Sequence, residues 1–171
     1  MNSPSLLEHL RDILILPFTV TVIVPHLIFE EPQSSLFISG YTVHFKIAGI
    51  LVGMCGVSLF IGTVFLFKTL GHGTLAPWMP TQKLVIVGPY RYCRNPMITG
   101  VLFTLVGEGL FLLSTNILLW AASFFMINTV YFIFSEEPGL KNRFGDEYGA
   151  YKKQVPRWIP KTRPFKNAGM F

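Results

Sequence analysis

Four long apolar segments constrain the fold of this 171-residue chain more than any other feature. The first covers residues 13–29 without a formal charge, the second covers 47–67, and the stretch 96–135 is long enough for two more, with a turn at 114–116. A helix of about 20 apolar residues crosses the hydrocarbon core of a bilayer. Hydrophobic residues make up 51% of the chain and charged residues only 13%, which indicates a membrane protein. The sequence therefore predicts an all-α, multi-pass protein with about four spans.

The second apolar segment is rich in glycine, at positions 49, 53, 56 and 62. Small residues spaced by three and four positions let a neighbouring membrane helix approach closely. Gly107 and Gly109 in the third segment would allow the same approach. We therefore expect at least one close helix pair.

Basic residues are distributed unevenly between the loops. Lysine and arginine accumulate on the cytoplasmic side of membrane proteins. With a cytoplasmic N-terminus, 13 of the 14 Lys and Arg residues, all but Lys46, fall on that side. We therefore expect both termini and the long central loop in the cytoplasm, at the plasma membrane if the cell is prokaryotic. The net charge of +5 does not indicate nucleic-acid binding, because the basic residues lie beside apolar segments where anionic lipids are the expected counterions.

The central loop ends in a compact polar motif, GPYRYCRNP, at residues 88–96. Asn95 followed by Pro96 is typical of a helix start. Its unpaired amides and positive dipole end attract a carboxylate or a phosphate. Arg91 and Arg94 would strengthen such a site, or they extend to lipid phosphates at the membrane surface.

A second polar motif, EEPGLKNRFGDEYGAYKKQVPRWIP, follows the fourth apolar segment at residues 136–160. Its apolar residues recur every three or four positions, which predicts an amphipathic helix lying along the membrane surface. Glu136 and Glu137, where the fourth span leaves the bilayer, either solvate a helix end or bind hydroxyl groups or a cation. The apolar face consists of Leu140, Phe144, Tyr148, Tyr151 and Val155.

These two motifs together resemble the superfamily of isoprenylcysteine carboxyl methyltransferases and phospholipid methyltransferases. The resemblance covers residues 71–160, where both motifs occur in the family's order. It departs at Asn95, where the prenylcysteine enzymes have histidine, and at Ile98, where the family has tyrosine. Residues 1–70 match only as generic membrane helices. The resemblance implies a single domain over residues 1–171 that uses S-adenosylmethionine, bound on the cytoplasmic side between the central loop, the helical hairpin and the C-terminal segment.

The resemblance also implies which residues hold the cofactor. Arg94 and the helix start suit the carboxylate of S-adenosylmethionine, and Glu136 or Glu137 suits its ribose diol or its ammonium group. Tyr90 and the backbone of residues 84–88 would flank the adenine. The expected cofactor-binding residues are Leu84, Val85, Gly88, Tyr90, Arg94, Asn95, Pro96, Gly100, Glu136 and Glu137.

Two further residues are candidates for the chemistry. Arg157 pairs with an anionic substrate head group or extends to lipid, and Glu108 is either a functional ionisable group at membrane depth or a protonated glutamate bonded to a neighbouring helix. The implied acceptor is lipophilic or lipid-tethered and enters from the bilayer. It offers the carboxylate of a prenylcysteine-like molecule, which needs no base, or the amine of a lipid, whose proton needs a route. The histidine and cysteine spacings predict no metal site.

Two other functions stay open at this point. One is a membrane reductase of the sterol-reductase type that uses NADPH, since those enzymes have a related C-terminal architecture. The absence of a further basic cluster for a 2′-phosphate argues against it. The other is a non-catalytic membrane scaffold that retains the fold.

Overall fold

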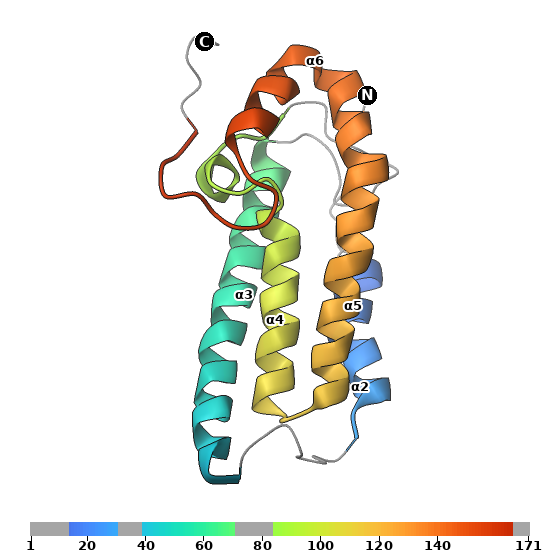
Figure 1. Ribbon diagram of the computed structural model, residues 1–171, viewed down its shortest axis with the longest axis vertical. Coiled ribbons are helices and arrows are strands. Elements are labelled where there is room, and N and C mark those ends of the chain that lie inside the picture. The colour runs from blue at the N-terminus through green and yellow to red at the C-terminus, as the bar shows by residue number, and fades with distance from the viewer. Residues whose placement is uncertain (1–13, 31–38, 71–83, 166–171) are drawn as a thin grey trace.

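The computed structural model describes residues 14–30, 39–70 and 84–165, and these ranges contain no β-strand. Figure 1 shows α3, α4 and α5 running lengthwise beside one another, with α2 against α5 and α6 at one end. The first part of the central loop, residues 71–83, lies outside the described residues. The elements are η1 (Leu14–Ile23), α2 (Val24–Ile28), η2 (Ser39–Tyr41), α3 (Thr42–Leu70), η3 (Gly88–Arg91), α4 (Pro96–Phe111), α5 (Thr115–Tyr131), η4 (Phe132–Glu136) and α6 (Glu137–Gln154).

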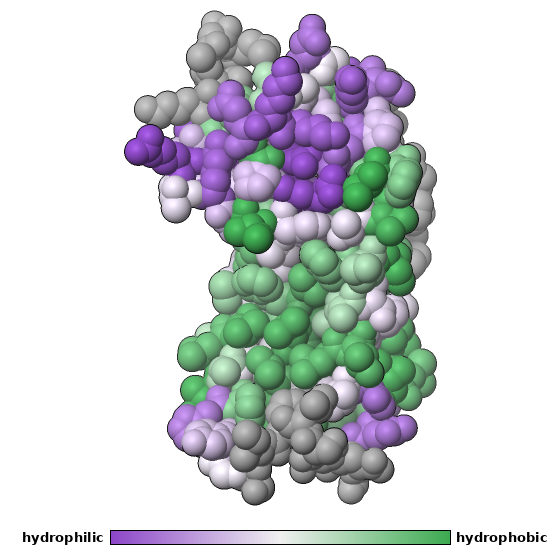
Figure 2. Space-filling view, in the orientation of Figure 1, coloured by the Kyte–Doolittle hydropathy of each residue, from purple (hydrophilic) through white to green (hydrophobic). Residues whose placement is uncertain are grey.

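Apolar helices form the body of the molecule. Within the described ranges, two helices are long and apolar enough to cross a membrane: Thr42–Leu66, and Thr115–Gln154, in which α5 continues through η4 into α6. Leu16–Ile28 and Pro96–Phe111 are shorter apolar helices. Figure 2 shows apolar surface around the middle of the molecule and a hydrophilic region at the end that carries α6. The expected all-helical architecture is confirmed for the described residues, and four complete membrane spans stay a prediction.

Two side chains of α5 hold the first apolar segment. The segment is π-helical over η1 and continues into α2, where Pro25 has no amide hydrogen to donate. The indole Nε1 of Trp120 donates to the Val20 carbonyl of η1 at 3.1 Å. The amide Nδ2 of Asn116 donates to the carbonyl of Ile28, at the end of α2, at 3.2 Å. The irregular first helix is thereby fixed against α5.

α3 and α4 pack with almost no side chains between them. A Cβ atom added at Gly56 would lie 2.5 Å from the amide nitrogen of Thr104, and one added at Gly100 would lie 2.8 Å from that of Phe60. Van der Waals contact between backbones holds helices together in lipid, where hydrophobic burial contributes little. The close helix pair predicted from the glycines is confirmed, although a Cβ at Gly62 would meet no described atom within 4 Å. The contact is formed by Gly49, Gly53, Gly56, Gly100 and Gly107.

α4 and α5 form the predicted tight hairpin. Leu113 makes the turn with a φ of 54°. The side chain of Ser114 accepts a hydrogen bond from the amide of Ile117 at 3.4 Å and so caps α5. Gly109 allows α4 to approach Leu118 of α5 closely.

α6 is two helices joined at Gly145, and the prediction of one continuous helix is wrong. Gly145 has φ 52° and ψ −126°, a conformation that residues with a side chain rarely adopt. The chain turns there and runs back toward the bundle (Figure 1). The residues of the predicted apolar face do cluster together, but they pack against other segments of the chain. The location of this segment on a membrane surface stays a prediction. Tyr148, Tyr151, Val155 and Phe165 form a buried cluster against which Leu84, Ile86, Leu140 and Phe144 pack.

Candidate active site

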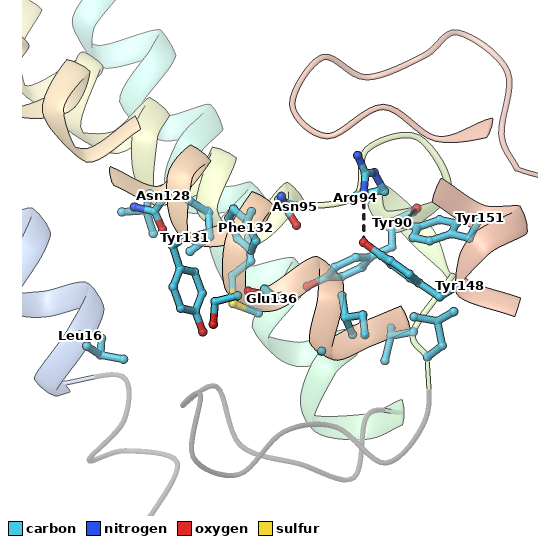
Figure 3. A pocket seen from close by; sticks show the side chains of 18 of the residues that line it. Leu16, Tyr90, Arg94, Asn95, Asn128, Tyr131, Phe132, Glu136, Tyr148 and Tyr151 are labelled. Atoms are coloured by element: carbon cyan, nitrogen blue, oxygen red, sulfur yellow. Dashed lines mark hydrogen bonds between the residues drawn. The ribbon is translucent and has the colours of Figure 1, made fainter. Parts of the chain in front are cut away.

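A cavity of about 570 Å³ lies where the polar end of the molecule meets the apolar helices. Its volume is within the range of small-molecule sites. Figure 3 shows side chains from the loop before α4, from α5 and η4, and from α6 converging on it, with Leu16 of the first helix opposite. The polar walls carry Tyr90, Arg94, Asn95, Glu136 and Tyr148, and the apolar walls carry Leu16, Val20, Ile98, Val101 and Phe124.

The segment that follows α6 fixes the loop before α4. The amide of Arg94 donates to the carbonyl of Pro156 at 2.9 Å, and the amide of Phe165 donates to the carbonyl of Arg91 at 2.9 Å. The Nε of Arg91 donates back to the Phe165 carbonyl at 3.0 Å. The two polar motifs are therefore one structure, in which Arg91 has a supporting position.

Buried donors complete this connection. The hydroxyl of Tyr151 donates to the carbonyl of Tyr90 at 2.6 Å, and the Sγ of Cys93 donates to the carbonyl of Arg157 at 3.1 Å. Burial raises the pKa of the Tyr151 hydroxyl and of the Cys93 thiol. Both groups therefore keep their protons at neutral pH and serve as donors.

Glu137 joins the segments of this wall by ion pairs. Its side chain is only 4% exposed; Oε1 accepts from Arg94 at 2.8 Å and from Arg157 at 2.7 Å, and Oε2 pairs with Lys152 at 2.7 Å. Burial acts to raise the pKa of Glu137, but the hydrogen bonds from Arg157 and Lys152 and the charge of Arg94 hold it below its usual value. Glu137 is therefore a carboxylate at neutral pH and forms ion pairs with cations from both motifs.

Glu136 lines the cavity instead. It lies just past the apolar residues of η4, and Figure 3 shows its side chain on the same side as Tyr131 and away from Arg94. Burial raises the pKa of Glu136 to about 7; Arg143 opposes this shift, and the charge of Glu137 adds to it. Near neutral pH both protonation states are populated, as suits a group that exchanges protons.

The start of α4 opens into the cavity. Asn95 is at the N-cap position, but within the described chain its side chain makes no capping hydrogen bond. Met97 and Ile98 of the first turn line the cavity. The Nη1 of Arg94 donates to the Tyr148 hydroxyl at 3.1 Å as well as to Glu137, while its buried Nε has no partner among the described residues. An uncapped helix start and an arginine donor without a partner are groups that favour an anion.

A comparison with known families bears on the reaction. The profile of the phospholipid methyltransferase family matches residues 45–147, which is more than half of the chain. The chain belongs to the phospholipid methyltransferase family. The match begins in α3 and ends in α6, so it includes Arg94, Glu136 and Glu137. No curated protein and no solved structure matches the chain. The resemblance inferred from the two polar motifs is confirmed.

Part of the predicted site lies around the cavity of this methyltransferase family member. Pro96 is buried in the first turn of α4, and Gly88 makes the turn before Tyr90 with a φ of 53°. The roles assigned to these residues stay predictions. The predicted cofactor residues that line the cavity are Leu84, Val85, Tyr90, Arg94, Asn95 and Glu136.

Other predicted residues do not reach the cavity. Gly100 faces α3 in the glycine contact, and Arg157 and Glu137 pair with each other. Glu108 lies about 18 Å along α4 from the helix start, at 1.5 Å per residue, in a separate groove beside α3. The structure therefore gives no support to the predicted catalytic roles of Arg157 and Glu108.

The prediction missed several lining residues. Tyr148 was assigned to an apolar face, yet its hydroxyl reaches Arg94. Asn128 and Tyr131 of α5 and Arg143 of α6 also line the cavity. A polar side chain within an apolar segment, such as Asn128, is the sequence feature that could have identified these lining residues.

Proposed function

We propose that this protein transfers a methyl group from S-adenosylmethionine to a lipophilic acceptor carried in the membrane. The observation that carries the proposal is one cavity with a charged wall at the polar end of the molecule and an apolar wall formed by the helices. Such a cavity suits a charged cofactor from water and an acceptor from the bilayer. Family membership indicates the reaction type.

The polar wall fits the charged groups of S-adenosylmethionine. Arg94 and the uncapped start of α4 would bind the carboxylate. Tyr90, Leu84 and Val85 provide an aromatic and apolar surface for the adenine. When bound, the cofactor supplies an electrophilic methyl carbon attached to a good leaving group.

On this proposal, an amine acceptor fits the α5 side of the cavity. Glu136 faces it, whereas Arg157, the cation proposed for an anionic head group, pairs with Glu137 at 2.7 Å. Asn128 donates its Nδ2 to the Phe124 carbonyl at 2.8 Å, so its amide oxygen is the atom that suits an N–H donor. A lipid amine therefore meets acceptor groups on the α5 side of the cavity.

The side chains contribute alignment, exclusion of water and a proton acceptor. A neutral amine nitrogen bonds to the methyl carbon as the carbon–sulfur bond breaks, and its proton passes to the Glu136 carboxylate. The apolar wall from the first helix and α5 keeps bulk water away from this step. We assign the site to the cytoplasmic face, because basic side chains gather at the same end of the molecule. In the described chain these include Lys141, Arg143, Lys152, Lys153, Lys161 and Arg163.

The experiment is a titration of the detergent-purified protein with S-adenosylhomocysteine, followed by thermal shift. Saturable binding should weaken at least roughly tenfold in Arg94→Met, as for the loss of a charged hydrogen bond. It should be unchanged in Arg163→Met, which removes an exposed arginine outside the cavity. Circular dichroism confirms that each variant is folded.

NADPH is the matched competitor ligand. Binding of NADPH without S-adenosylhomocysteine would favour a reductase, and binding of neither would favour a scaffold. Incorporation of labelled methyl groups into phosphatidylethanolamine, but not into a prenylcysteine acid, tests the acceptor. Glu136→Gln should lose this incorporation.

A further inference from the structure

A second hollow, of about 480 Å³, lies between α3 and α4 and shares no lining residue with the candidate active site. Glycines of the α3 and α4 contact contribute to its lining, so part of the groove is formed by backbone atoms. Its lining includes Gly49, Gly53, Met54, Val57, Glu108 and Phe111. Glu108 is the charged residue of this otherwise largely apolar groove.

The carboxyl group of Glu108 lacks a donor. In the part of the chain that the structure describes, its Oε2 is buried and has no hydrogen-bond partner. The nearby Thr104 hydroxyl donates to the Gly100 carbonyl of its own helix at 2.9 Å. A polar group at membrane depth without a partner is strongly unfavourable, because lipid chains offer no hydrogen bonds. The groove beside Glu108 is the route by which a donor can reach it.

The depth of Glu108 limits what that donor can be. Glu108 lies three residues before the end of α4 at Phe111, at the end of the helix farthest from the polar motifs. The head group of a lipid in the adjacent leaflet can reach this level from the nearby membrane surface, with its acyl chain extending toward the bilayer centre. An acyl chain suits the apolar side chains of the groove, such as Met54 and Val57.

We propose that this groove binds a membrane lipid whose head group donates an N–H or O–H hydrogen bond to Glu108. The bound lipid belongs to the leaflet opposite the candidate active site. It is therefore distinct from the methyl acceptor, and the site does not depend on the proposed reaction.

The test compares two lipids with the same oleoyl chains. Phosphatidylethanolamine has N–H donors in its head group, and phosphatidylcholine has none. The protein is exchanged into each lipid, and retained lipids are counted by native mass spectrometry while the unfolding midpoint is recorded. We expect one more tightly held phosphatidylethanolamine, bound roughly tenfold better than phosphatidylcholine, as a hydrogen bond to a charged group would give.

Glu108→Leu should abolish this preference and leave S-adenosylhomocysteine binding unchanged, and Glu108→Gln should give an intermediate preference because its amide oxygen still accepts. Glu147→Gln is the matched control, since Glu147 lines neither cavity and its loss should leave the preference intact. The proposal is overturned if the wild type shows no preference, or if Glu108→Leu retains it. It is also overturned if Glu108→Leu converts a dimer to a monomer, since a second copy of the chain then occupies the groove.

Discussion

Two contacts position α4, and they depend on different properties of their residues. Along its length, α4 meets α3 through backbone atoms at glycines, and an added methyl group has no space at Gly49, Gly56, Gly100 or Gly107. Just before its first turn, Arg94 is held by the buried carboxylate of Glu137, which also binds Arg157 and Lys152. The first contact is sensitive to size and the second to charge. Lipid provides no water to solvate an unpaired ion, so glycine packing holds the apolar region and ion pairs hold the polar end.

The largest effect should come from adding one methyl group to the glycine contact. In Gly56→Ala the new Cβ would lie 2.5 Å from the Thr104 nitrogen and 2.7 Å from the Gly100 oxygen, so the helices must separate. We expect a loss of about 3 kcal/mol or more in the free energy of unfolding. Gly62→Ala, where the Cβ meets no described atom within 4 Å, should instead be neutral or stabilise by up to about 1 kcal/mol. Equal thermal midpoints for the two variants in detergent would contradict the size-sensitive contact.

Removing charge while keeping shape should affect the polar end next most strongly. Glu137→Gln leaves Arg94 and Arg157 without their anion. We expect a loss of about 2 to 3 kcal/mol in the free energy of unfolding. This is at the low end for a broken buried ion pair, because the Arg157 side chain is 23% exposed. Lys152→Met should cost less than about 1 kcal/mol, because the Lys152 side chain is 48% exposed and water screens its ion pair with Glu137. Chemical denaturation measures both. A Gln variant as stable as the wild type would show that charge does not hold this wall.

The two neighbouring glutamates should respond to pH with opposite signs. The folded pKa of Glu136, about 7, is above its unfolded value, so its stabilising contribution is complete below about pH 4.5 and is lost as the pH rises to 7. The folded pKa of Glu137 is lowered, so its contribution is present above the unfolded value and is lost as the pH falls through the folded one.

Glu136→Gln removes the first of these effects. Without ligand, the variant should match the wild type below about pH 4.5 and exceed its stability by about 3 kcal/mol at pH 8, since the pKa of Glu136 rises from 4.5 to about 7 and one pKa unit corresponds to about 1.4 kcal/mol. Unfolding midpoints across this range measure the difference. A constant difference from pH 5 to pH 8 would show that Glu136 does not titrate there.

The smallest effect should come from a neutral hydrogen bond at the polar end. Tyr151→Phe leaves the Tyr90 carbonyl without its 2.6 Å donor, and we expect a loss of about 1 kcal/mol. Tyr41→Phe, at a tyrosine 57% exposed, should change stability by less than about 0.5 kcal/mol. If the two changes were equal in thermal unfolding, the link from Tyr151 to the loop would contribute nothing.

The helical architecture could be predicted because lipid leaves the backbone few alternatives. A long apolar segment must satisfy its own amides and carbonyls, so it becomes a helix. The close helix contact could also be predicted, from the spacing of the glycines at 49, 53 and 56, because close approach needs small residues on one helix face. The two polar motifs identified the family and the region of the cavity.

The positions of individual side chains could not be predicted in the same way. Adjacent residues on a helix point about 100° apart, so either Glu136 or Glu137 can face a cavity, and the packing of η4 and α6 decides which. The turn at Gly145 gave no distinct signal, because Gly139 and Gly149 occur in the same segment and only Gly145 among them has a positive φ. Gly100, placed in the site by its motif, serves helix packing.

The first helix lies outside the segment that matches the family, yet it forms one wall of the cavity. The family match begins at residue 45, yet Leu16, Pro17 and Val20 line the cavity from a helix that Trp120 and Asn116 attach by hydrogen bonds. Substitutions on this helix can reshape the acceptor side of the cavity while Arg94 and Glu136 stay as they are. On the proposed function, changes in this one helix can therefore alter which acceptor is methylated without altering the groups that bind the methyl donor.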